Sequence, residues 1–245
     1  MNRNFQILAA GMLILFIIIA FTEPAFAGPG GKIASVMFRS FWAKVVLAIL
    51  IILFLPLILY VWLKEHFAER RTISDLRNLA RDSRHFDWLL LRERISECFY
   101  RVHTAWRRED MARASEWMTD WYWRNQQIVY IDQWVREGLV NRCRVKKITA
   151  IRPLFLAYRD EGAEHDGSRI AVSISARMED YLARRENGEI VEGKKGFTEV
   201  ETVWTFIFTG GKWVVANIEE SDMSLSYARL TNELPAHMGG CELKR

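Results

Sequence analysis

The sequence predicts an α+β protein: an N-terminal hydrophobic signal or anchor and one transmembrane helix, then a cone of about three helices packed on a curved antiparallel sheet. Two observations predict this fold class. Apolar residues recur at three- and four-residue steps after position 87, and from about position 145 they alternate with a period of two. Because the helices come first and the strands follow, we expect the helices to cover one face of the sheet. Strong curvature of the sheet would give the cone a concave pocket.

The segment 196–219 carries the clearest strand signal. Its Gly210-Gly211 pair provides the positive φ angles of a tight hairpin turn. A two-residue loop predicts the cross-strand pairs Phe208–Trp213, Ile207–Val214, Phe206–Val215, Thr205–Ala216, Trp204–Asn217 and Val203–Ile218. Since both faces carry apolar side chains, we expect this hairpin at the centre of the sheet. Its Trp204, Phe206 and Trp213 should line the cone.

The composition disfavours several functional classes. The formal charge of +4 is mild, and acidic residues interleave with the basic ones, so nucleic-acid binding is not indicated. Cys98, Cys143 and Cys241 have no CxxC spacing, which disfavours a zinc site and a disulfide framework and fits a reducing compartment. The five histidines lack HxxxH and HExxH spacing, so no metal is expected.

No catalytic constellation is visible in the sequence either. His103 is more typical of a core or surface position than of a general base. Cys98 lies on an apolar helical stripe, as an inert core cysteine would. Glu199 and Glu201 alternate on one strand face, where paired carboxylates and a solvated strand edge are both consistent with the pattern. We therefore predict no catalytic residues and no cofactor.

Residues 1–27 have the parts of a secretory signal. Arg3 gives a positive start, residues 7–21 are apolar, and Ala25-Phe26-Ala27 forms a cleavage site. An uncleaved first membrane anchor is the alternative. Either way, residues 28–44 would form a short extracytoplasmic segment.

Residues 45–63 are uncharged and apolar, with Trp42, Tyr60 and Trp62 near the ends, as in a transmembrane helix. Pro56 is tolerated in such a helix. More basic residues follow this span than precede it, which predicts a cytoplasmic location for the domain after it.

Residues 64–86 form a charged juxtamembrane helix. Its Lys64, Arg70, Arg71 and Arg77 could contact anionic lipid. The interspersed acidic residues dilute this charge, so a solvated stalk is the favoured interpretation.

Residues 87–222 are expected to form the α+β domain. A first helix starts near Asp87. A second, capped by Asp110, would carry Met111 through Trp121, and a third would end at Gly138. The first strand region covers 145–158, where Pro153 indicates a bulge or an edge. Residues 223–245 are expected to be a loosely attached tail.

Aromatic residues cluster in the second and third predicted helices. They either form the wall of the cone or line a pocket mouth or protein-docking surface. The neighbours at 121–123 cannot all face one side of a helix, so at least one ring should lie near the surface. The candidate partner or pocket contacts are Trp117, Trp121, Tyr122, Trp123 and Trp134.

Four sequence segments resemble a known family: FYRVHTAWRREDMARASEWMTDWYW, GLVNRCRVKKITAIRPLFL, RIAVSISARMEDYLARRENGEIVEG and VETVWTFIF with GKWVVANIE. They are similar to the C-terminal domain of the forty-four-kilodalton subunit of the mitochondrial inner-membrane translocase and its bacterial relatives. The resemblance covers roughly residues 87–220 and consists of packing residues. It implies a nuclear-transport-factor-two-like cone fold.

The resemblance also implies a membrane-tethered domain that binds a protein or a lipid. We therefore expect a non-enzymatic scaffold at the bacterial inner membrane, linked to protein transport or membrane-complex assembly, with an unidentified protein partner. Two alternatives stay open: a small-ligand or enzymatic cone, and a domain that binds anionic lipid.

Overall fold

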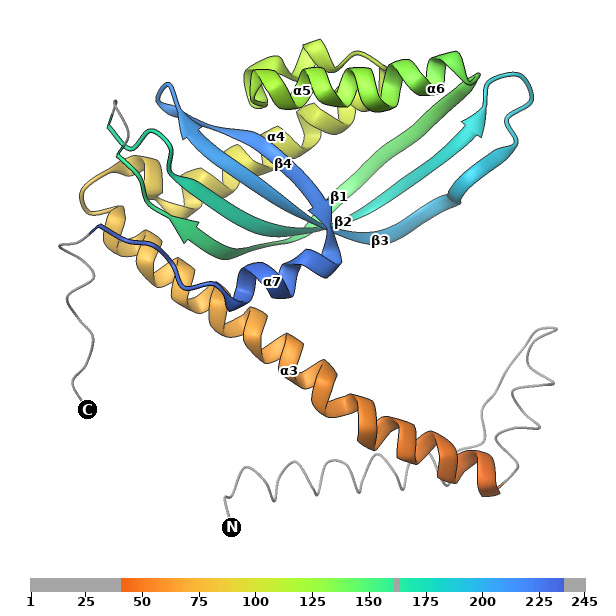
Figure 1. Ribbon diagram of the computed structural model, residues 1–245, viewed down its shortest axis with the longest axis horizontal. Coiled ribbons are helices and arrows are strands. Elements are labelled where there is room, and N and C mark those ends of the chain that lie inside the picture. Colours follow the sequence, from red (N-terminus) through yellow and green to blue (C-terminus); the bar gives the residue numbers. More distant parts are fainter. Residues whose placement is uncertain (1–40, 161–163, 236–245) are drawn as a thin grey trace. The chain divides into compact units, whose positions relative to one another are not determined.

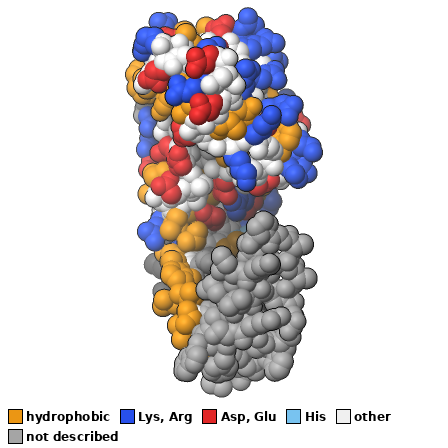
Figure 2. Space-filling view, turned by 90° about the vertical axis from the view of Figure 1, so that its right-hand side faces the viewer, with side chains coloured by type: hydrophobic (Ala, Val, Ile, Leu, Met, Phe, Trp, Pro, Cys, Tyr) orange, Lys and Arg blue, Asp and Glu red, His pale blue; other side chains and the backbone are white. Residues whose placement is uncertain are grey.

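The computed structural model describes residues 41–160 and 164–235, so the predicted signal segment lies outside the described residues. The chain forms two compact units, Met1–Trp62 and Leu63–Arg245. Helix α3 (Phe41–Leu79) starts in the first unit and ends in the second. Its stretch Ile49–Leu79 is long and apolar enough to cross a membrane. Figure 2 shows hydrophobic side chains along the exposed part of α3, whereas charges of both signs are interspersed over the second unit.

Four long antiparallel strands form the sheet of the second unit (Figure 1). These are β1 (Leu139–Ala157), β2 (Arg169–Arg184), β3 (Ile190–Thr209) and β4 (Lys212–Glu220). They follow one another in the order β1-β2-β3-β4, because strands joined by short turns pair with their sequence neighbours. The hairpin of β3 and β4 therefore lies at an edge of the sheet, and the prediction that it is central was wrong. The outer side of β4 is partly covered where the Thr119 N–H donates to the Val215 carbonyl (2.9 Å).

The register of this hairpin agrees with the prediction only next to the turn. The pairs of Phe208, Ile207 and Phe206 with Trp213, Val214 and Val215 are confirmed. Beyond them a β-bulge leaves Ala216 unpaired, so that Thr205 pairs with Asn217, Trp204 with Ile218 and Val203 with Glu219. The three predicted pairs beyond Phe206 were wrong by one residue for this reason.

Strand β1 starts at Leu139, six residues earlier than expected. It is an edge strand, and its register with β2 shifts between Pro153 and Phe155. The indication that Pro153 marks a bulge or an edge is confirmed on both counts, since proline cannot donate a ladder hydrogen bond.

The helical elements surround this sheet. They are η1 (Arg84–Phe86), α4 (Trp88–Arg107), η2 (Met111–Trp117), α5 (Asp120–Gln126), the π-helical η3 (Gln127–Ile131), α6 (Asp132–Arg136), η4 (Ser221–Met223) and α7 (Ser224–Arg229). Asp87 caps α4, because its Oδ1 accepts from the Leu89 and Leu90 N–H groups. Gly138 ends the α5–α6 segment with φ +68°, as predicted.

The second predicted helix differs from the expectation. Asp110 makes no capping hydrogen bond and instead pairs with Arg113 (2.9 Å). The segment η2 is a 3₁₀-helix that ends at Trp117, and the chain is extended at Met118. A new helix then begins with Thr119, whose Oγ1 accepts from the Tyr122 N–H.

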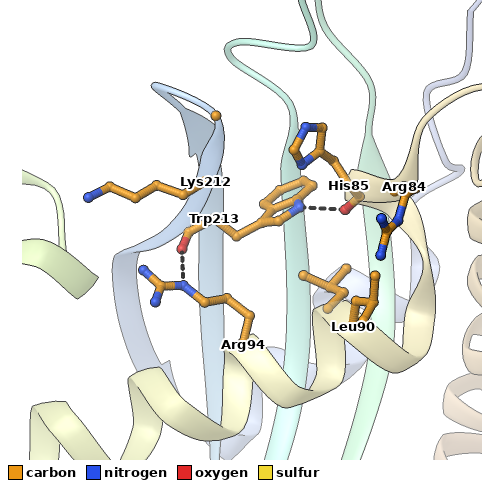
Figure 3. A pocket seen from close by; sticks show the side chains of 8 residues that line it. Arg84, His85, Leu90, Arg94, Lys212 and Trp213 are labelled. Carbon is orange, nitrogen blue, oxygen red and sulfur yellow. Dashed lines mark hydrogen bonds between the residues drawn. The ribbon is translucent and has the colours of Figure 1, made fainter.

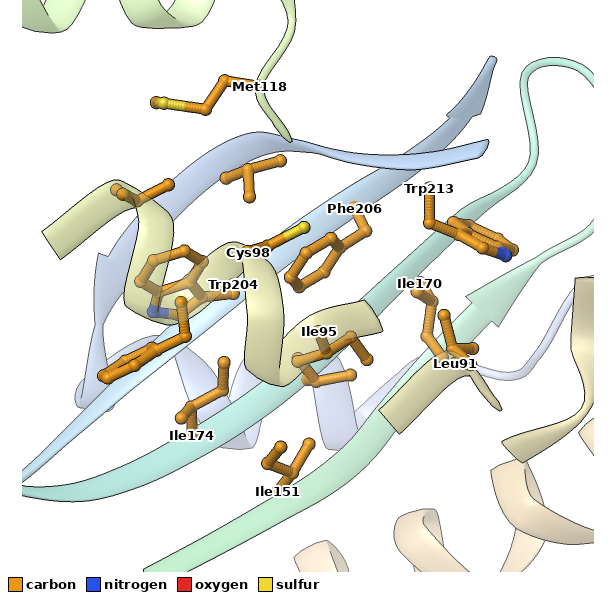
Figure 4. Packing of buried hydrophobic residues seen from close by; sticks show 14 of the residues in the cluster. Leu91, Ile95, Cys98, Met118, Ile151, Ile170, Ile174, Trp204, Phe206 and Trp213 are labelled. Atoms are coloured by element: carbon orange, nitrogen blue, oxygen red, sulfur yellow. The ribbon is translucent and has the colours of Figure 1, made fainter. Parts of the chain in front are cut away.

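Helix α4 forms the centre of the main core. Its buried stripe faces the β2 and β3 residues of even number, which include Ile170, Ile174, Trp204 and Phe206 (Figure 4). Trp204 is 1% exposed and lies against the Phe99 ring, with 5.1 Å between the ring centroids. This contact joins the helical layer to the sheet.

The opposite face of the sheet is covered by the end of α3 and by α7 (Figure 1). Ala68, Thr72 and Leu76 are buried, so the segment predicted to be a solvated stalk is instead packed on one side. The apolar stripe of this segment, at four-residue spacing, packs against the sheet and the C-terminal segment. The extended segment after α7 is tied to α3 as well, because Asn232 Nδ2 donates to Asp75 (2.7 Å).

The expectation of a loosely attached tail from residue 223 was therefore wrong up to residue 235. Ser224 and Ala228 are buried, and Glu233 exchanges backbone hydrogen bonds with the end of β1. The residues after 235 lie outside the described part.

Arg152 on β1 is the centre of an ionic network on this face. Its guanidinium lies 2.7 Å from Glu201 on β3 and 3.6 Å from Glu65 on α3. Ser173 donates to Glu201 and Ser224 donates to Glu65. This Arg152 network, made of these five residues, joins α3, the sheet and α7.

Candidate functional site

A cavity of about 370 Å³ lies between the helices and the concave face of the sheet. We call it the cone cavity. The residues that line it are Val102, His103, Trp106, Tyr122, Gln126, Tyr130, Trp134, Asn141, Cys143, Asp180, Thr202, Trp204, Ile218 and Glu220. A partly apolar cavity with a few polar groups is the usual form of a ligand site.

The α5–α6 segment supplies one wall through side chains at four-residue spacing. Tyr122, Gln126, Tyr130 and Trp134 all line the cavity. In a regular α-helix such a series drifts around the axis, because four residues exceed one turn. The π-helical turn η3 (Gln127–Ile131) takes more residues per turn and so offsets that drift.

Three aromatic rings meet in this wall. The ring centroids of Trp106 and Tyr130 are 5.8 Å apart, those of Trp106 and Trp134 5.5 Å, and those of Tyr130 and Trp134 5.9 Å. We call these residues the aromatic triad. Each ring lies within the range of favourable aromatic contact with both others.

His103 is a neutral hydrogen-bond acceptor towards the cavity. Its Nδ1 lies 2.8 Å from the Phe99 carbonyl oxygen, and only a protonated nitrogen can donate to a carbonyl. The proton of the neutral ring is therefore on Nδ1, and Nε2 carries the lone pair. Burial lowers the pKa of His103 to about 4, although the hydrogen bond to Phe99 opposes that shift.

Asp180 and Glu220 bring carboxylates to the cavity from β2 and β4. Partial withdrawal from water raises the pKa of Asp180, and the nearby Glu192 adds to the shift. The Asn141 Nδ2 group opposes it by donating to Asp180 (3.0 Å). By accessible surface Asp180 is exposed, so solvent reaches the carboxylate.

Burial raises the pKa of three further groups and keeps them protonated. Burial raises the pKa of the Cys143 thiol to about 12 and that of Cys98 in the core likewise to about 12. Tyr122 accepts from the Ile218 N–H (2.8 Å), and burial raises its pKa above the usual range. Among the described residues, no group of three or more His, Cys, Asp or Glu could hold a metal ion.

The structure brings only part of the predicted contact set to the cavity. Tyr122 and Trp134 line it, whereas Trp121 is 71% exposed on the outside of α5. The expectation of one surface ring among residues 121–123 is met by Trp121. Trp117 lies beneath the Arg101 guanidinium (4.8 Å), and Trp123 donates from Nε1 to Asp120 (3.2 Å). That any of these side chains contacts a partner stays a prediction.

Of the three hairpin aromatics expected to line the cone, only Trp204 lines the cavity. Phe206 is completely buried in the core. Trp213 borders a separate, open hollow of about 410 Å³ (Figure 3). There its Nε1 donates to the His85 carbonyl (2.8 Å) and its own carbonyl accepts from Arg94 Nε (3.1 Å). Arg84, Arg94 and Lys212 make this second hollow basic.

The proposed lipid contacts lie on α3. Lys64, Arg70 and Arg77 are exposed, whereas Arg71 donates to the Leu230 carbonyl (2.6 Å) and is partly buried. Glu199 and Glu201 have separate partners, since Thr149 donates to Glu199 and Glu201 belongs to the Arg152 network. The lipid contact stays a prediction.

The family model of the Tim44-like domain matches residues 74–219, more than half of the chain. The chain belongs to the Tim44-like domain family. The match covers α4 to α6 and the four strands, and it begins within α3. The resemblance noted from the packing motifs is thereby confirmed, as is the α+β cone. A comparison with curated proteins finds no match.

Two solved structures show a distant resemblance to this Tim44-like chain. The intermembrane space region of the chloroplast protein ARC6 is 9% identical, with a TM-score of 0.36 over 52% of this chain and 95% of that one. AclR, a putative hydroxylase from Streptomyces galilaeus, is 15% identical, with a TM-score of 0.24 over 60% of this chain and 91% of that one.

The cavity residues His103, Asn141, Asp180 and Glu220 were not predicted as site residues. One signal for Asp180 is present in the sequence. In the sequence it follows the even-numbered apolar series Ile170, Val172, Ile174, Ala176 and Met178, which is buried in β2, whereas Asp180 itself is exposed. A carboxylate on an apolar strand face is unusual enough to indicate a site.

The neutral state of the partly buried His103 predicts a loss of stability in mild acid. Because the folded pKa of about 4 lies below the unfolded value of 6.5, the unfolded chain binds more protons between these values. The stabilisation is complete above about pH 6.5 and is lost as the pH falls towards 4. The expected loss is about 2 kcal/mol at pH 5. Denaturant unfolding of the full chain in non-ionic detergent at several pH values measures it.

In this test His103→Gln should remove that part of the pH dependence while leaving a folded protein at pH 7.5. An identical loss of stability from pH 7.5 to pH 5 in the parent and the variant would contradict the assignment.

Proposed function

We propose that this protein is a membrane-anchored, non-enzymatic binding module. In this proposal α3 fixes the chain in the bacterial inner membrane, and the Tim44-like domain presents its cone cavity to a protein partner on the cytoplasmic side. The process served is protein transport or the assembly of a membrane complex. The excess of basic residues after the predicted span supports the orientation.

The placement of the cavity carries the proposal. The cone cavity is on the helical face of the sheet, whereas the end of α3 and α7 pack on the opposite face. The Arg152 network joins the domain to its anchor helix on that opposite face. These contacts therefore leave the cavity uncovered by the described chain. The exposed Trp121 lies on α5, part of the segment that forms a cavity wall, and offers an apolar surface for a partner outside the cavity.

The chemistry of the cavity supports binding rather than catalysis. An acid–base catalyst has a pKa near the working pH. The pKa values of His103 (about 4) and Cys143 (about 12) lie far from neutrality on either side. Neither group is suited to proton transfer or nucleophilic attack at pH 7.

Photocrosslinking in native membranes tests this proposal. The full chain carries benzoylphenylalanine in place of Trp121 or, separately, Trp134. The control carries it in place of Leu230, an exposed apolar residue directly after α7 on the opposite face. We expect the same membrane-protein adduct from both positions on the α5–α6 segment and not from the control. Adducts equal at all three positions, or at none, would contradict the proposal.

A further inference from the structure

The charge of the cone cavity is opposite to that of the protein. Asp180 and Glu220 line it, and no lining residue is Lys or Arg, although the chain has 34 basic residues and 30 acidic ones. No described residue forms an ion pair with either carboxylate. The second hollow shows the reverse, with three cations and no acid. An anionic guest would be repelled from the cone cavity and a cationic one attracted.

The other polar atoms in the cavity add mainly acceptors. His103 presents the lone pair of Nε2, as argued above. Asn141 Oδ1 is buried and has no hydrogen-bond partner, because only the amide nitrogen of Asn141 takes part in the hydrogen bond to Asp180. Gln126 is 8% exposed and lines the cavity, and its side-chain amide makes no hydrogen bond among the described residues. The buried, unpaired Asn141 Oδ1 is costly unless a ligand or water completes its hydrogen bonds.

The aromatic triad is also without a cation. Elsewhere the chain places its own guanidinium groups over aromatic rings, as Arg101 does over Trp117 and Arg144 over Phe197. No such pair involves the triad within the described part of the chain. Adjacent aromatic rings next to carboxylates are the usual surroundings of a bound ammonium or guanidinium group.

We propose that the cone cavity binds an organic cation, an alkylammonium or guanidinium group on an apolar stem. The stem would pack against the aromatic triad while the charge is stabilised by Asp180 and Glu220. This inference rests on the proposed binding function and specifies its ligand chemistry. A free amine and the Lys or Arg side chain of a polypeptide both have this chemistry.

Calorimetry on the full chain in non-ionic detergent tests the charge requirement. The probes are n-butylammonium and n-butylguanidinium, with n-butanol and butyrate as neutral and anionic counterparts. We expect the cations to bind at least about tenfold more tightly than either counterpart. Equal binding of butyrate or butanol, or no binding of the cations, would overturn the proposal.

Matched variants test the residues. Asp180→Asn and Glu220→Gln should each weaken cation binding by about tenfold, whereas Asp82→Asn, an exposed site outside the cavity, should not. Trp134→Leu should weaken it and Trp121→Leu should not. If one carboxylate variant fails to fold, the other decides. Unchanged cation affinity in a folded carboxylate variant would overturn the proposal.

Two further arms separate the ligand sources. A capped Gly-Lys-Gly peptide that binds more tightly than its norleucine counterpart indicates a polypeptide side chain, whereas binding of the free cations alone indicates a small amine. Photocrosslinking from position 121 in the Asp180→Asn variant keeps the two proposals apart. A retained adduct together with absent cation binding would refute the ligand class and leave the binding function standing.

Discussion

Replacing Arg152 by Ala is expected to destabilise the Tim44-like domain by about 3 kcal/mol. The substitution leaves the carboxylates of Glu65 and Glu201 next to each other without their shared cation. The Glu65 side chain is only 11% exposed, so water compensates its charge poorly. Removing one partner of a buried ion pair typically costs about 3–5 kcal/mol, and the partial exposure of Glu201 places the estimate at the lower end.

Denaturant unfolding of the full chain in non-ionic detergent measures this effect. Arg142→Ala is the matched control, because Arg142 is exposed on the same strand and should change stability by less than about 0.5 kcal/mol. Combining Arg152→Met with Glu65→Gln and Glu201→Gln should recover much of the loss, since no uncompensated charge remains. Equal stability of the Arg152→Ala and Arg142→Ala variants would show that the network contributes nothing.

Trp204→Ala should have the largest effect of any single aromatic truncation in the sheet, about 4 kcal/mol. The Trp204 ring is 1% exposed and contacts the rings of Phe99, His103 and Phe206. Its Nε1 also donates to Thr202 (2.9 Å). Truncation would remove these contacts and open the floor of the cone cavity. Trp204→Phe should recover part of the loss, because it restores an aromatic ring without the hydrogen bond.

The control for this prediction is Trp121→Ala. That ring is 71% exposed, so its removal should cost less than about 0.5 kcal/mol in the same unfolding experiment. A similar loss of stability in both variants would contradict the prediction that the buried contacts of Trp204 stabilise the domain.

Local patterns predicted the fold class and several element ends. The period of the apolar residues separated helices from strands, and Gly138 and Gly210-Gly211 marked a helix end and a turn. These features depend on neighbouring residues alone. The bulge at Ala216 and the edge position of β4 depend on what the strand packs against, which no local pattern contains. The same holds for Asp110, which could cap a helix by type but pairs with Arg113.

The site was less predictable than the fold. Trp134 and Tyr122 were proposed because aromatic clusters are visible in the sequence, and both line the cavity. The sequence does not distinguish His103 from an ordinary core or surface histidine, since its neutral state results from burial by elements distant in the chain. The mixed charge of the juxtamembrane helix indicated solvent on all sides. Glu65 instead forms an ion pair with Arg152, which lies 87 residues later in the chain. Only the folded structure brings these two residues together.

The extra residue in β4 has a consequence for its last two residues. Cross-strand partners share a face of the sheet, and Thr202 on the cavity face pairs with Glu220. Glu219 therefore points the other way, where it accepts a hydrogen bond from the Tyr227 hydroxyl of α7 (2.7 Å). In the regular register predicted from the sequence, Ala216 would pair with Thr205 and Glu219 with Thr202, so the two glutamates would exchange sides. The single unpaired alanine thus decides which of two chemically identical neighbours lines the cone cavity and which one holds the C-terminal helix.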